Sequence, residues 1–184
     1  ILENYENTPF IIKPLVSGGA KNTFKVDFNN VEEIRIKMDL LIKSEDFIAQ
    51  PFVSEIEEVG EYSLVFFNSA YSHAVLKSPA NADFRVQHFF GGSISVIEPS
   101  ESMIMACQRY VDEFCKDSLY VRVDGVLIKG EFHLMELEMI EPYLFLSTQN
   151  KAMMNYKNAL KDRLSSYKFL AKTGQNHFPS GQLS

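Results

Sequence analysis

Three carboxylates occupy two neighbouring segments of the chain, each with the residue pattern of a β-strand. Asp124 lies in the first segment, at about 119–128, and Glu136 and Glu138 lie in the second, at about 131–140. Side chains point alternately to the two faces of a strand, so Glu136 and Glu138 share one face. If the two strands pair through the short turn between them, Asp124 can lie on that face as well. The spacing therefore predicts three carboxylates crowded on one surface of a sheet.

Such a cluster has a physical cost that a metal ion removes. Like charges that face each other destabilise a sheet. Mg²⁺ prefers oxygen ligands and is commonly bound by a few carboxylates together with the phosphates of a substrate. The cluster therefore predicts a metal site formed by Asp124, Glu136 and Glu138, for Mg²⁺ or alternatively Mn²⁺. The competing interpretation is a solvated sheet face with scattered charges, and the spacing alone leaves both open.

A lysine and a glycine turn near the N-terminus form a second group. Lys13 ends a short apolar run and is followed by a proline and by the loop Ser17-Gly18-Gly19. A glycine turn with exposed N–H groups can cradle a phosphate, and a lysine at the strand end can neutralise it. The lysine precedes the glycines, so the pattern is not that of a Walker A loop. The alternative is an ordinary surface turn.

Two further cations, Lys77 and Arg85, flank a polar stretch that follows a strand-like run. The stretch from Lys77 to Gly92 has the composition of a loop. A guanidinium offers a planar fork to phosphate or carboxylate, and an ammonium offers a point charge. Both residues are candidates for catalysis, and both could equally be ordinary surface charges.

The whole pattern predicts an α+β protein, because strands paired as hairpins alternate with helices. The expected strands lie at about 10–13, 24–28, 47–53, 62–67, 71–76, 119–128 and 131–140, and the expected helices at about 30–43, 100–116 and 148–170. Between the third and fourth strands, the acidic run 55–61 is expected to be a solvated turn. In the last helix, the residues at helical spacing predict an inner face of Met153, Tyr156, Leu160, Leu164 and Tyr167.

Composition restricts the partners. The chain has 184 residues, 46% of them apolar, and a net charge of −6. The acidic balance argues against a nucleic acid and against an anionic membrane, because both attract basic surfaces. It leaves a nucleotide open, since a few local cations and backbone N–H groups suffice to hold phosphates. No apolar run approaches the ~20 residues of a transmembrane helix, and no signal peptide is visible.

The cysteines and histidines indicate neither a disulfide nor a metal site. Cys107 and Cys115 are eight residues apart in one helical pattern. Their Cα atoms would then be about 12 Å apart, beyond the reach of a disulfide. We expect reduced, buried thiols in a cytoplasmic protein. The histidines show no metal-ligand spacing, so ordinary core or surface roles are expected for His73, His88, His133 and His177.

Taken in order from about Phe10 to Leu146, these segments resemble the ATP-grasp family. The Lys13 strand with its glycine loop resembles the central lysine strand and the phosphate-covering loop. The segment 49–53 resembles the hinge strand that holds adenine, and 83–92 resembles the arginine and glycine loop near the γ-phosphate. The resemblance assigns the nucleotide to Lys13, Ser17, Gly18, Gly19, Gln50, Pro51, Phe52 and Val53.

The acidic strands extend the resemblance. Asp124 followed by Glu136-Leu137-Glu138 is similar to the Asp and Glu-x-Asn metal ligands of the family, with Glu138 where many relatives carry Asn. The amino-acid sequence of these strands is most similar to that of glutathione-synthetase-like and cycloserine-biosynthesis-type proteins. The Asp-x-Arg of relatives is absent around Glu61 and Ser63. One carboxylate of the acidic run 55–61 would suit the ribose hydroxyls, without being assignable.

The resemblance implies an ATP-grasp fold of largely antiparallel sheets with flanking helices, which holds Mg-ATP. It implies an ATP-dependent carboxylate–amine or related carbon–nitrogen ligase that activates a carboxylate as an acyl phosphate. Lys77 and Arg85 would stabilise the transferring phosphoryl group. The substrates would be a small carboxylate and an amine, such as an amino acid or peptide, and a homo-oligomer is compatible with the sequence. The alternatives are a non-catalytic, regulatory nucleotide-binding module and a plain α+β interaction domain.

The expected organisation has three parts. Residues 1–54 would form a smaller nucleotide-binding subdomain, 55–172 a larger subdomain with the metal site, and 173–184 a flexible tail. A lysine expected on the first subdomain, and the pre-grasp domain of relatives, have no counterpart in the sequence. We therefore expect the chain to be part of a longer protein.

Overall fold

The computed structural model describes residues 8–16, 18–79 and 92–173. They divide into two compact units. The N-terminal unit contains the residues up to Val59, with Pro79 and Gly92. The C-terminal unit contains Gly60–Ser78 and the residues from Ser93 onward. Each unit is built around a sheet of its own.

The N-terminal unit has a three-stranded antiparallel sheet in the order β2-β1-β3. Its elements are β1 (Phe10–Pro14), β2 (Phe24–Val26), α1 (Val31–Leu41), β3 (Phe47–Pro51) and the single turn α2 (Glu55–Glu58). Phe10, Val26 and Ile34 form the core between the sheet and α1. Since side chains alternate along β1, Phe10 and Ile12 face α1, whereas Ile11 and Lys13 face the other way.

The start of α1 is fixed by two side chains. Asp27 accepts from the backbone N–H groups of Asn29 and Asn30 at 2.7 and 3.2 Å. The Asn30 amide in turn donates to the Lys25 carbonyl oxygen at 2.9 Å. Asn and Asp favour such turns because their short side chains compete for backbone groups. The turn joins the edge strand β2 to the helix that covers its sheet.

The C-terminal unit has a five-stranded antiparallel sheet in the order β6-β5-β4-β7-β8. Its elements are β4 (Glu61–Phe67), β5 (Ala70–Ser78), β6 (Ser93–Ile97), α3 (Glu101–Phe114), β7 (Tyr120–Ile128), β8 (Glu131–Glu138) and α4 (Asn150–Thr173). The tight turn Asn68-Ser69 joins β4 to β5, and the tight turn Lys129-Gly130 joins β7 to β8. All four turn residues have positive φ. The antiparallel sheets and their helices confirm the predicted α+β class.

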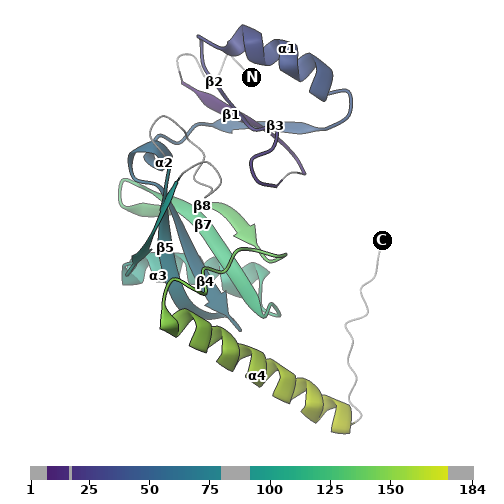
Figure 1. Cartoon of the computed structure of the whole chain (residues 1–184), viewed down its shortest axis with the longest axis vertical. Coiled ribbons are helices and arrows are strands. Elements are labelled where there is room, and N and C mark those ends of the chain that lie inside the picture. The colour runs from purple at the N-terminus through teal and green to yellow at the C-terminus, as the bar shows by residue number, and fades with distance from the viewer. Residues whose placement is uncertain (1–7, 17, 80–91, 174–184) are drawn as a thin grey trace. The chain divides into compact units, whose positions relative to one another are not determined.

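The two faces of this sheet are covered differently. On one face, Leu64, Phe66 and Val123 pack against Met103 and Cys107 of α3, which runs behind the strands in Figure 1. The Ser100 side chain caps this helix by accepting from the Met103 backbone N–H at 3.3 Å.

On the opposite face, Val65, Phe67 and Val75 pack with Phe145 and with α4. The predicted inner face of α4 is wrong in part. Ala152 and Ala159 are the buried residues of the helix, and Tyr156 packs beside them. Met153, Leu164 and Tyr167 are at least half exposed. Small side chains let the helix approach the sheet closely, which a search for large apolar residues does not detect.

Three local elements differ from the predictions. β5 continues to Ser78, so Lys77 lies in a strand and not in a loop. β6 (Ser93–Ile97) was not predicted, because two serines interrupt its short apolar pattern. The acidic run after β3 forms α2 and then enters β4. The division into 1–54, 55–172 and 173–184 stays a prediction, and residues 174–184 lie outside the described part.

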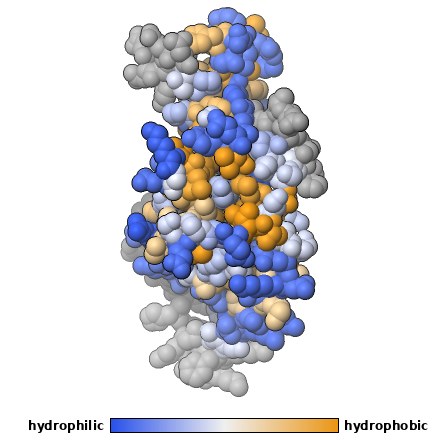
Figure 2. Space-filling view, turned by 90° about the vertical axis from the view of Figure 1, so that its left-hand side faces the viewer, coloured by the Kyte–Doolittle hydropathy of each residue, from blue (hydrophilic) through white to orange (hydrophobic). Residues whose placement is uncertain are grey.

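The thiols and the surface complete the description. Cys107 and Cys115 are buried and free, as predicted, and burial raises the pKa of Cys107 to about 12. Figure 2 shows an apolar area among polar side chains on the face that it draws. Val96 of β6 and Met105 of α3 are large apolar side chains that remain exposed. Within the described ranges, no helix is long and apolar enough to cross a membrane.

Candidate functional site

The pairing of β7 with β8 brings the three predicted carboxylates together. Asp124 stands opposite Glu136, and Arg122 stands opposite Glu138, so all four side chains share one face. One carboxylate oxygen each from Asp124, Glu136 and Glu138 lies within 4.8 Å of the others. The proximity that the alternation predicted is therefore present, and the metal role of the cluster stays a prediction.

A bulge directly after Asp124 separates this cluster from the rest of the hairpin. Asp124 pairs with Glu136 but Gly125 pairs with Leu134, which leaves Met135 without a partner in the ladder. A Cβ atom at Gly125 would lie 2.4 Å from the His133 carbonyl oxygen. Only glycine therefore fits at this close approach. The extra residue shifts the alternation of β8, so that Leu134 and Leu137 both pack on the α3 side.

Asp124 is fixed by three donors. The Ser63 hydroxyl donates to its Oδ1 at 2.6 Å, and Lys77 Nζ donates to Oδ2 at 3.2 Å. Arg122 donates from Nε at 3.0 Å and from Nη2 at 2.8 Å. The Asp124 side chain is 1% exposed. Burial opposes its ionisation, but the charges of Lys77 and Arg122 outweigh burial and lower the pKa of Asp124.

Lys77 links Asp124 to a fourth carboxylate, Glu61. Lys77 and Glu61 are cross-strand partners on β5 and β4 and form an ion pair. Gly60 precedes Glu61 with a φ of +121°, and a Cβ there would lie 2.4 Å from the Lys77 carbonyl oxygen. Glycine therefore permits the entry into β4 that places Glu61 beside Lys77.

The pKa values in this network show an excess of negative charge. Burial, together with the charges of Asp124 and Glu136, raises the pKa of Glu61 to about 7 against the opposing effect of Lys77. Burial and the neighbouring carboxylates also raise the pKa of Glu138, although Arg122 opposes this. Two cations face four carboxylates when all are ionised, which leaves two negative charges. One divalent cation would balance them.

Arg122 connects the cluster to the segment that follows β8. Its Nη2 forms an ion pair with Glu138, and its Nη1 donates to the Tyr143 carbonyl oxygen at 3.1 Å. The guanidinium carbon lies 5.7 Å from the centre of the Phe145 ring. The ion pairs with Asp124 and Glu138 raise the pKa of Arg122 against the effect of its burial. A fixed, charged fork thus stands beside the carboxylates.

In the N-terminal unit, two predicted nucleotide residues lie on one sheet face. Ile11 pairs with Gln50 on one side and with Lys25 on the other, and Lys13 lies two residues along the same strand. Lys13, Lys25 and Gln50 therefore share the face that points away from α1. The turn at Gly18 and Gly19 is open, since a Cβ atom added at either glycine would have no atom within 4 Å. Ser17 and Arg85 lie outside the described residues.

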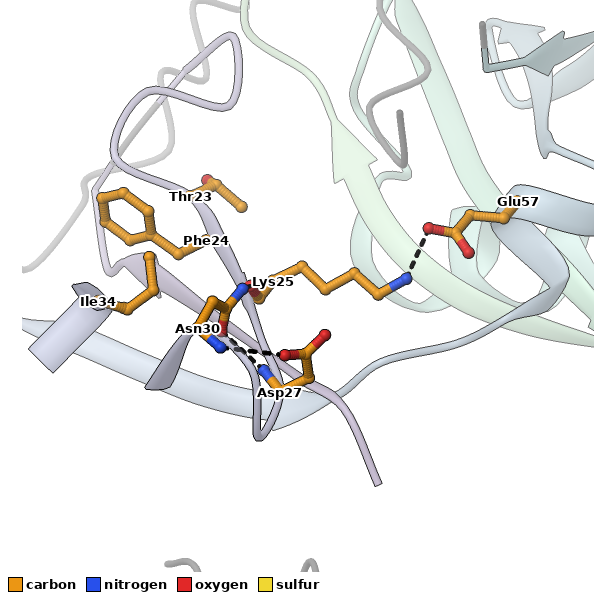
Figure 3. A pocket seen from close by; sticks show the side chains of 7 residues that line it. All are labelled: Thr23, Phe24, Lys25, Asp27, Asn30, Ile34 and Glu57. Atoms are coloured by element: carbon orange, nitrogen blue, oxygen red, sulfur yellow. Dashed lines mark hydrogen bonds and ion pairs between the residues drawn. The ribbon is translucent and has the colours of Figure 1, made fainter. Parts of the chain in front are cut away.

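The last hinge residues lie beside Lys25. The Phe52 backbone N–H donates to the Pro9 carbonyl oxygen at 2.9 Å, which fixes the segment Pro51–Val53 after β3. Lys25 Nζ lies 3.7 Å from the centre of the Phe52 ring and 2.6 Å from a Glu57 carboxylate oxygen. Figure 3 shows the Lys25 side chain extended toward Glu57.

An open pocket of about 380 Å³ lies next to this ion pair (Figure 3). It is lined by Thr23, Phe24, Lys25, Asp27, Asn30, Ile34 and Glu57. None of the residues predicted to bind the nucleotide lines it. The pocket is therefore a feature of the edge strand β2 and the turn into α1, and it does not mark the predicted phosphate loop.

Three residues of the C-terminal network were not predicted as members of the site. Arg122 could have been found, because it lies two residues before Asp124 on the same strand face. Glu61 and Ser63 could not, because their places depend on the pairing of β4 with β5 and β7. Glu61 is also a correction, since the acidic run was expected to be solvated and its side chain is 14% exposed.

Known proteins provide an independent comparison. No protein-family model matches the chain, and no curated protein matches it. Among solved structures, the D-cycloserine synthetase DcsG is similar with a TM-score of 0.70 and 25% identity, covering 88% of this chain and 58% of the other. D-alanine–D-alanine ligase from Bacillus anthracis, complexed with ATP, has a TM-score of 0.61 and 17% identity, covering 94% and 56%.

A third similar structure is the ATP-grasp ligase PsnB complexed with a phosphomimetic variant of a minimal precursor, Mg and ADP. It has a TM-score of 0.60 and 19% identity, covering 87% of this chain and 48% of the other. The chain thus spans about half to three-fifths of the length of these proteins. The two antiparallel sheets, the flanking helices and these likenesses agree, and this chain has the ATP-grasp fold.

Proposed function

We propose that the chain binds Mg-ATP and is the larger part of the ATP-grasp domain of an ATP-dependent carboxylate–amine or related carbon–nitrogen ligase. The single observation that carries the proposal is the charge network of the C-terminal unit, in which Asp124 is buried, Glu138 is half-buried and Glu136 is exposed. Asp124, Glu136 and Glu138 converge there beside Lys77 and Arg122. Clustered carboxylates of this kind are costly to a fold unless they serve a cation.

The residues present fit a divalent cation. Three oxygen donors lie within 4.8 Å of one another, and the network carries two uncompensated negative charges when it is ionised. Asp124, Glu136 and Glu138 would hold Mg²⁺, or alternatively Mn²⁺. An ion held by these residues would supply positive charge that offsets the charge of ATP phosphates. Lys77 contacts Asp124, Arg122 contacts Asp124 and Glu138, and both would add fixed positive charge next to the phosphates.

The N-terminal unit would contribute the nucleotide contacts. Lys13 shares a sheet face with Gln50, and its ammonium would pair with a phosphate on that face. The turn containing Ser17, Gly18 and Gly19 would cover the phosphates with backbone N–H groups. The backbone of Gln50–Val53 would hold the adenine edge. Arg85 would join Lys77 in stabilising the transferring group.

The reaction that suits these groups has two steps. A substrate carboxylate oxygen attacks the γ-phosphorus of ATP, the bond to the β–γ bridging oxygen breaks, and ADP leaves with that electron pair. An amine nitrogen then attacks the carbonyl carbon of the acyl phosphate, inorganic phosphate leaves, and the nitrogen loses a proton. Lys77 and Arg122 would stabilise the phosphoryl oxygens in the first step.

Small amino acids or peptides are the substrates we propose. The similar structures include a D-alanine–D-alanine ligase and a PsnB complex with a precursor peptide. Both kinds of substrate supply a carboxylate or an amine. The net charge of −6 gives no basic surface that would favour a nucleic acid.

Two measurements test this function in sequence. Titration calorimetry should detect ATP binding that tightens with Mg²⁺, and hydroxylamine trapping with parallel detection of ADP should reveal an acyl phosphate over a panel of amino acids and peptides. Mg-ATP binding without hydroxamate, also in a longer protein that contains this chain, would favour a non-catalytic nucleotide-binding module. The absence of any Mg-dependent ATP binding would leave a plain interaction domain.

A further inference from the structure

A second bulge in the C-terminal sheet places two polar side chains beneath α4. Val65 pairs with His73 and Phe66 pairs with Tyr71, so Ser72 has no partner across the ladder. A bulge redirects the side chains next to it. Ser72 and His73 are each 2% exposed, in a part of the sheet otherwise filled by apolar residues. Neither residue belongs to the predicted ligand sets.

Hydrogen bonds around the bulge fix the proton positions. The His73 Nε2 atom lies 2.9 Å from the Leu144 carbonyl oxygen, and Nδ1 lies 2.9 Å from the Ser72 hydroxyl. A carbonyl oxygen can only accept, so Nε2 carries the proton. In a neutral ring Nδ1 then accepts from Ser72, whose oxygen accepts from the Asn155 amide at 3.0 Å. Burial lowers the pKa of His73, which agrees with a neutral ring.

The segment that His73 holds also holds Arg122. The carbonyl oxygen of Tyr143, one residue before Leu144, accepts from Arg122 Nη1 at 3.1 Å. Phe145, one residue after Leu144, is 3% exposed and packs in the core with Tyr156 and Phe67. His73 and Phe145 therefore fix this segment from the sheet side, while Tyr143 presents its carbonyl to the guanidinium.

We propose that His73 is a positioning residue for the carboxylate cluster. Its hydrogen bond to the Leu144 carbonyl fixes the segment whose preceding carbonyl, that of Tyr143, accepts from Arg122. His73 thereby sets the position of Arg122 relative to Asp124 and Glu138. The functional consequence rests on the proposed Mg-ATP site. Arg122 contacts Asp124 and Glu138, two of the proposed ligands, so the place of the guanidinium would decide how much of each carboxylate is left for a cation. Asn155 and Ser72 extend the same chain of hydrogen bonds to α4.

The expected size follows from the indirect position of His73. Partners that orient metal-binding groups without touching the metal typically change metal affinity by about 10- to 100-fold when they are removed. His73→Leu removes the donor to Leu144 at similar volume. His73→Gln retains an N–H donor at a similar reach from the backbone. Both variants lack the imidazole ring, and they differ in whether residue 73 carries an N–H donor.

The first experiment measures Mg-dependent ATP binding by titration calorimetry in the parent, in both His73 variants and in His133→Leu. His133 lies on β8 of the same sheet, and its side chain makes no hydrogen bond in the described part of the chain. We expect the Mg-dependent tightening to fall by about 10-fold or more in His73→Leu and to be largely retained in His73→Gln and in the control. Equal losses in both His73 variants, or no loss in either, would overturn the proposal.

A second experiment does not depend on nucleotide binding. Long-range ¹H–¹⁵N spectra of the parent should show His73 as the neutral tautomer with the proton on Nε2. The Arg122 Nε–H signal, identified by its absence in Arg122→Lys, should shift in His73→Leu and stay near its parent position in His73→Gln. A proton on Nδ1, or an Arg122 signal that does not shift when the His73 donor is lost, would overturn the positioning role.

The two experiments separate the two proposals. If the parent does not bind Mg-ATP but the Arg122 signal responds to His73→Leu, the proposed function fails and the positioning of Arg122 holds. If the parent binds and neither readout responds, the positioning fails and the proposed function holds. If His73→Leu does not fold, the tautomer in the parent and the His73→Gln spectrum still decide.

Discussion

The two units present their candidate residues in opposite states. In the C-terminal unit, Asp124 is 1% exposed and accepts from Ser63, Lys77 and Arg122. In the N-terminal unit, the ion pair between Lys25 and Glu57 leaves side chains that are 25% and 40% exposed. The C-terminal cluster therefore has a buried centre at Asp124, with Glu138 half-buried and Glu136 exposed at its edge, whereas both members of the N-terminal ion pair are open to water.

The stability of the fold depends more on the buried charges than on the exposed ones. Breaking a buried, hydrogen-bonded charge network leaves an uncompensated charge, whereas an exposed pair is replaced by water at little cost. The cluster that would hold the metal is thus also part of the stability of its unit. The residues that would contact the nucleotide can be changed with little effect on folding. Substitutions in both units test this contrast, beginning with the largest expected effect.

Arg122→Met should be strongly destabilising. It removes the partner of Asp124 and Glu138, and loss of one member of a buried ion pair typically costs about 3–5 kcal/mol. Chemical denaturation would measure the free energy of unfolding. Arg35→Met is the matched control, because Arg35 pairs with Glu32 and Asp39 on α1 but is 60% exposed. Its loss should cost less than about 1 kcal/mol. Similar costs for the two variants would contradict the contrast between the units.

Replacing Glu136 and Glu138 together with Gln should abolish the response to Mg²⁺. A ligand at 100 times its dissociation constant stabilises a protein by about 2.7 kcal/mol, and this increment should disappear. Glu136→Gln alone should also raise the melting temperature without metal, because it relieves repulsion among the carboxylates. Melting scans with Mg-ATP, with ATP alone and without ligand would show both effects. A double variant that responds to Mg-ATP like the parent would exclude this cluster as the metal site.

Glu61→Gln should change how stability depends on pH. The pKa of Glu61 rises on folding from its ordinary value of 4.5 to about 7. Between these values the folded state binds more protons than the unfolded state, so stability falls as the pH rises, by at most about 1.4 kcal/mol per pH unit. The variant should lose this fall. Glu131→Gln, at an exposed position of β8, should keep it. Denaturation at several pH values between about 4.5 and 7.5 decides.

The parts of the site that were predicted depend on local periodicity. Alternation along β8 is a property of neighbouring residues, so it placed Glu136 and Glu138 on one face before any pairing was known. Asp124 joins them only through the bulge at Met135, because the register set by the turn at Lys129-Gly130 would place Asp124 opposite Met135 on the other face. Lys13 and Gln50 were assigned to the nucleotide through resemblance, and their common sheet face follows from the pairing of β1 with β3.

The parts that were missed depend on contacts distant in sequence. Ser63, which was not predicted, meets Asp124 across 61 residues, and the predicted residue Lys77 meets Asp124 across 47, a contact that no local pattern indicates. Lys77 lies in a polar stretch of the sequence, so no local pattern indicates that β5 continues through it. Its burial is compensated by Glu61 and Asp124, which are distant in sequence. The bulge at Ser72 is equally invisible, since it depends on one residue more in β5 than in β4. The sequence therefore located Asp124, Glu136, Glu138 and Lys77 but not the contacts that hold them together.

The smallest effect on stability is expected at Lys13. Lys13→Met keeps the length and the apolar stem of the side chain and removes only its charge. Lys13 makes no ion pair within the described ranges. The free energy of unfolding should therefore stay within about 0.5 kcal/mol of the parent, as for most surface substitutions.

ATP binding should nevertheless weaken in Lys13→Met, because a charge-assisted hydrogen bond contributes about 1.5–3 kcal/mol. Titration of both proteins with Mg-ATP would measure this. Lys25→Met is the control, because Lys25 shares the sheet face of Lys13 but its charge is already paired with Glu57. If Lys13→Met binds ATP like the parent, Lys13 is a surface charge. If Lys13→Met binds ATP weakly and also has a lower free energy of unfolding than the parent, Lys13 contributes to the stability of the N-terminal unit. The contrast with the C-terminal cluster would then fail.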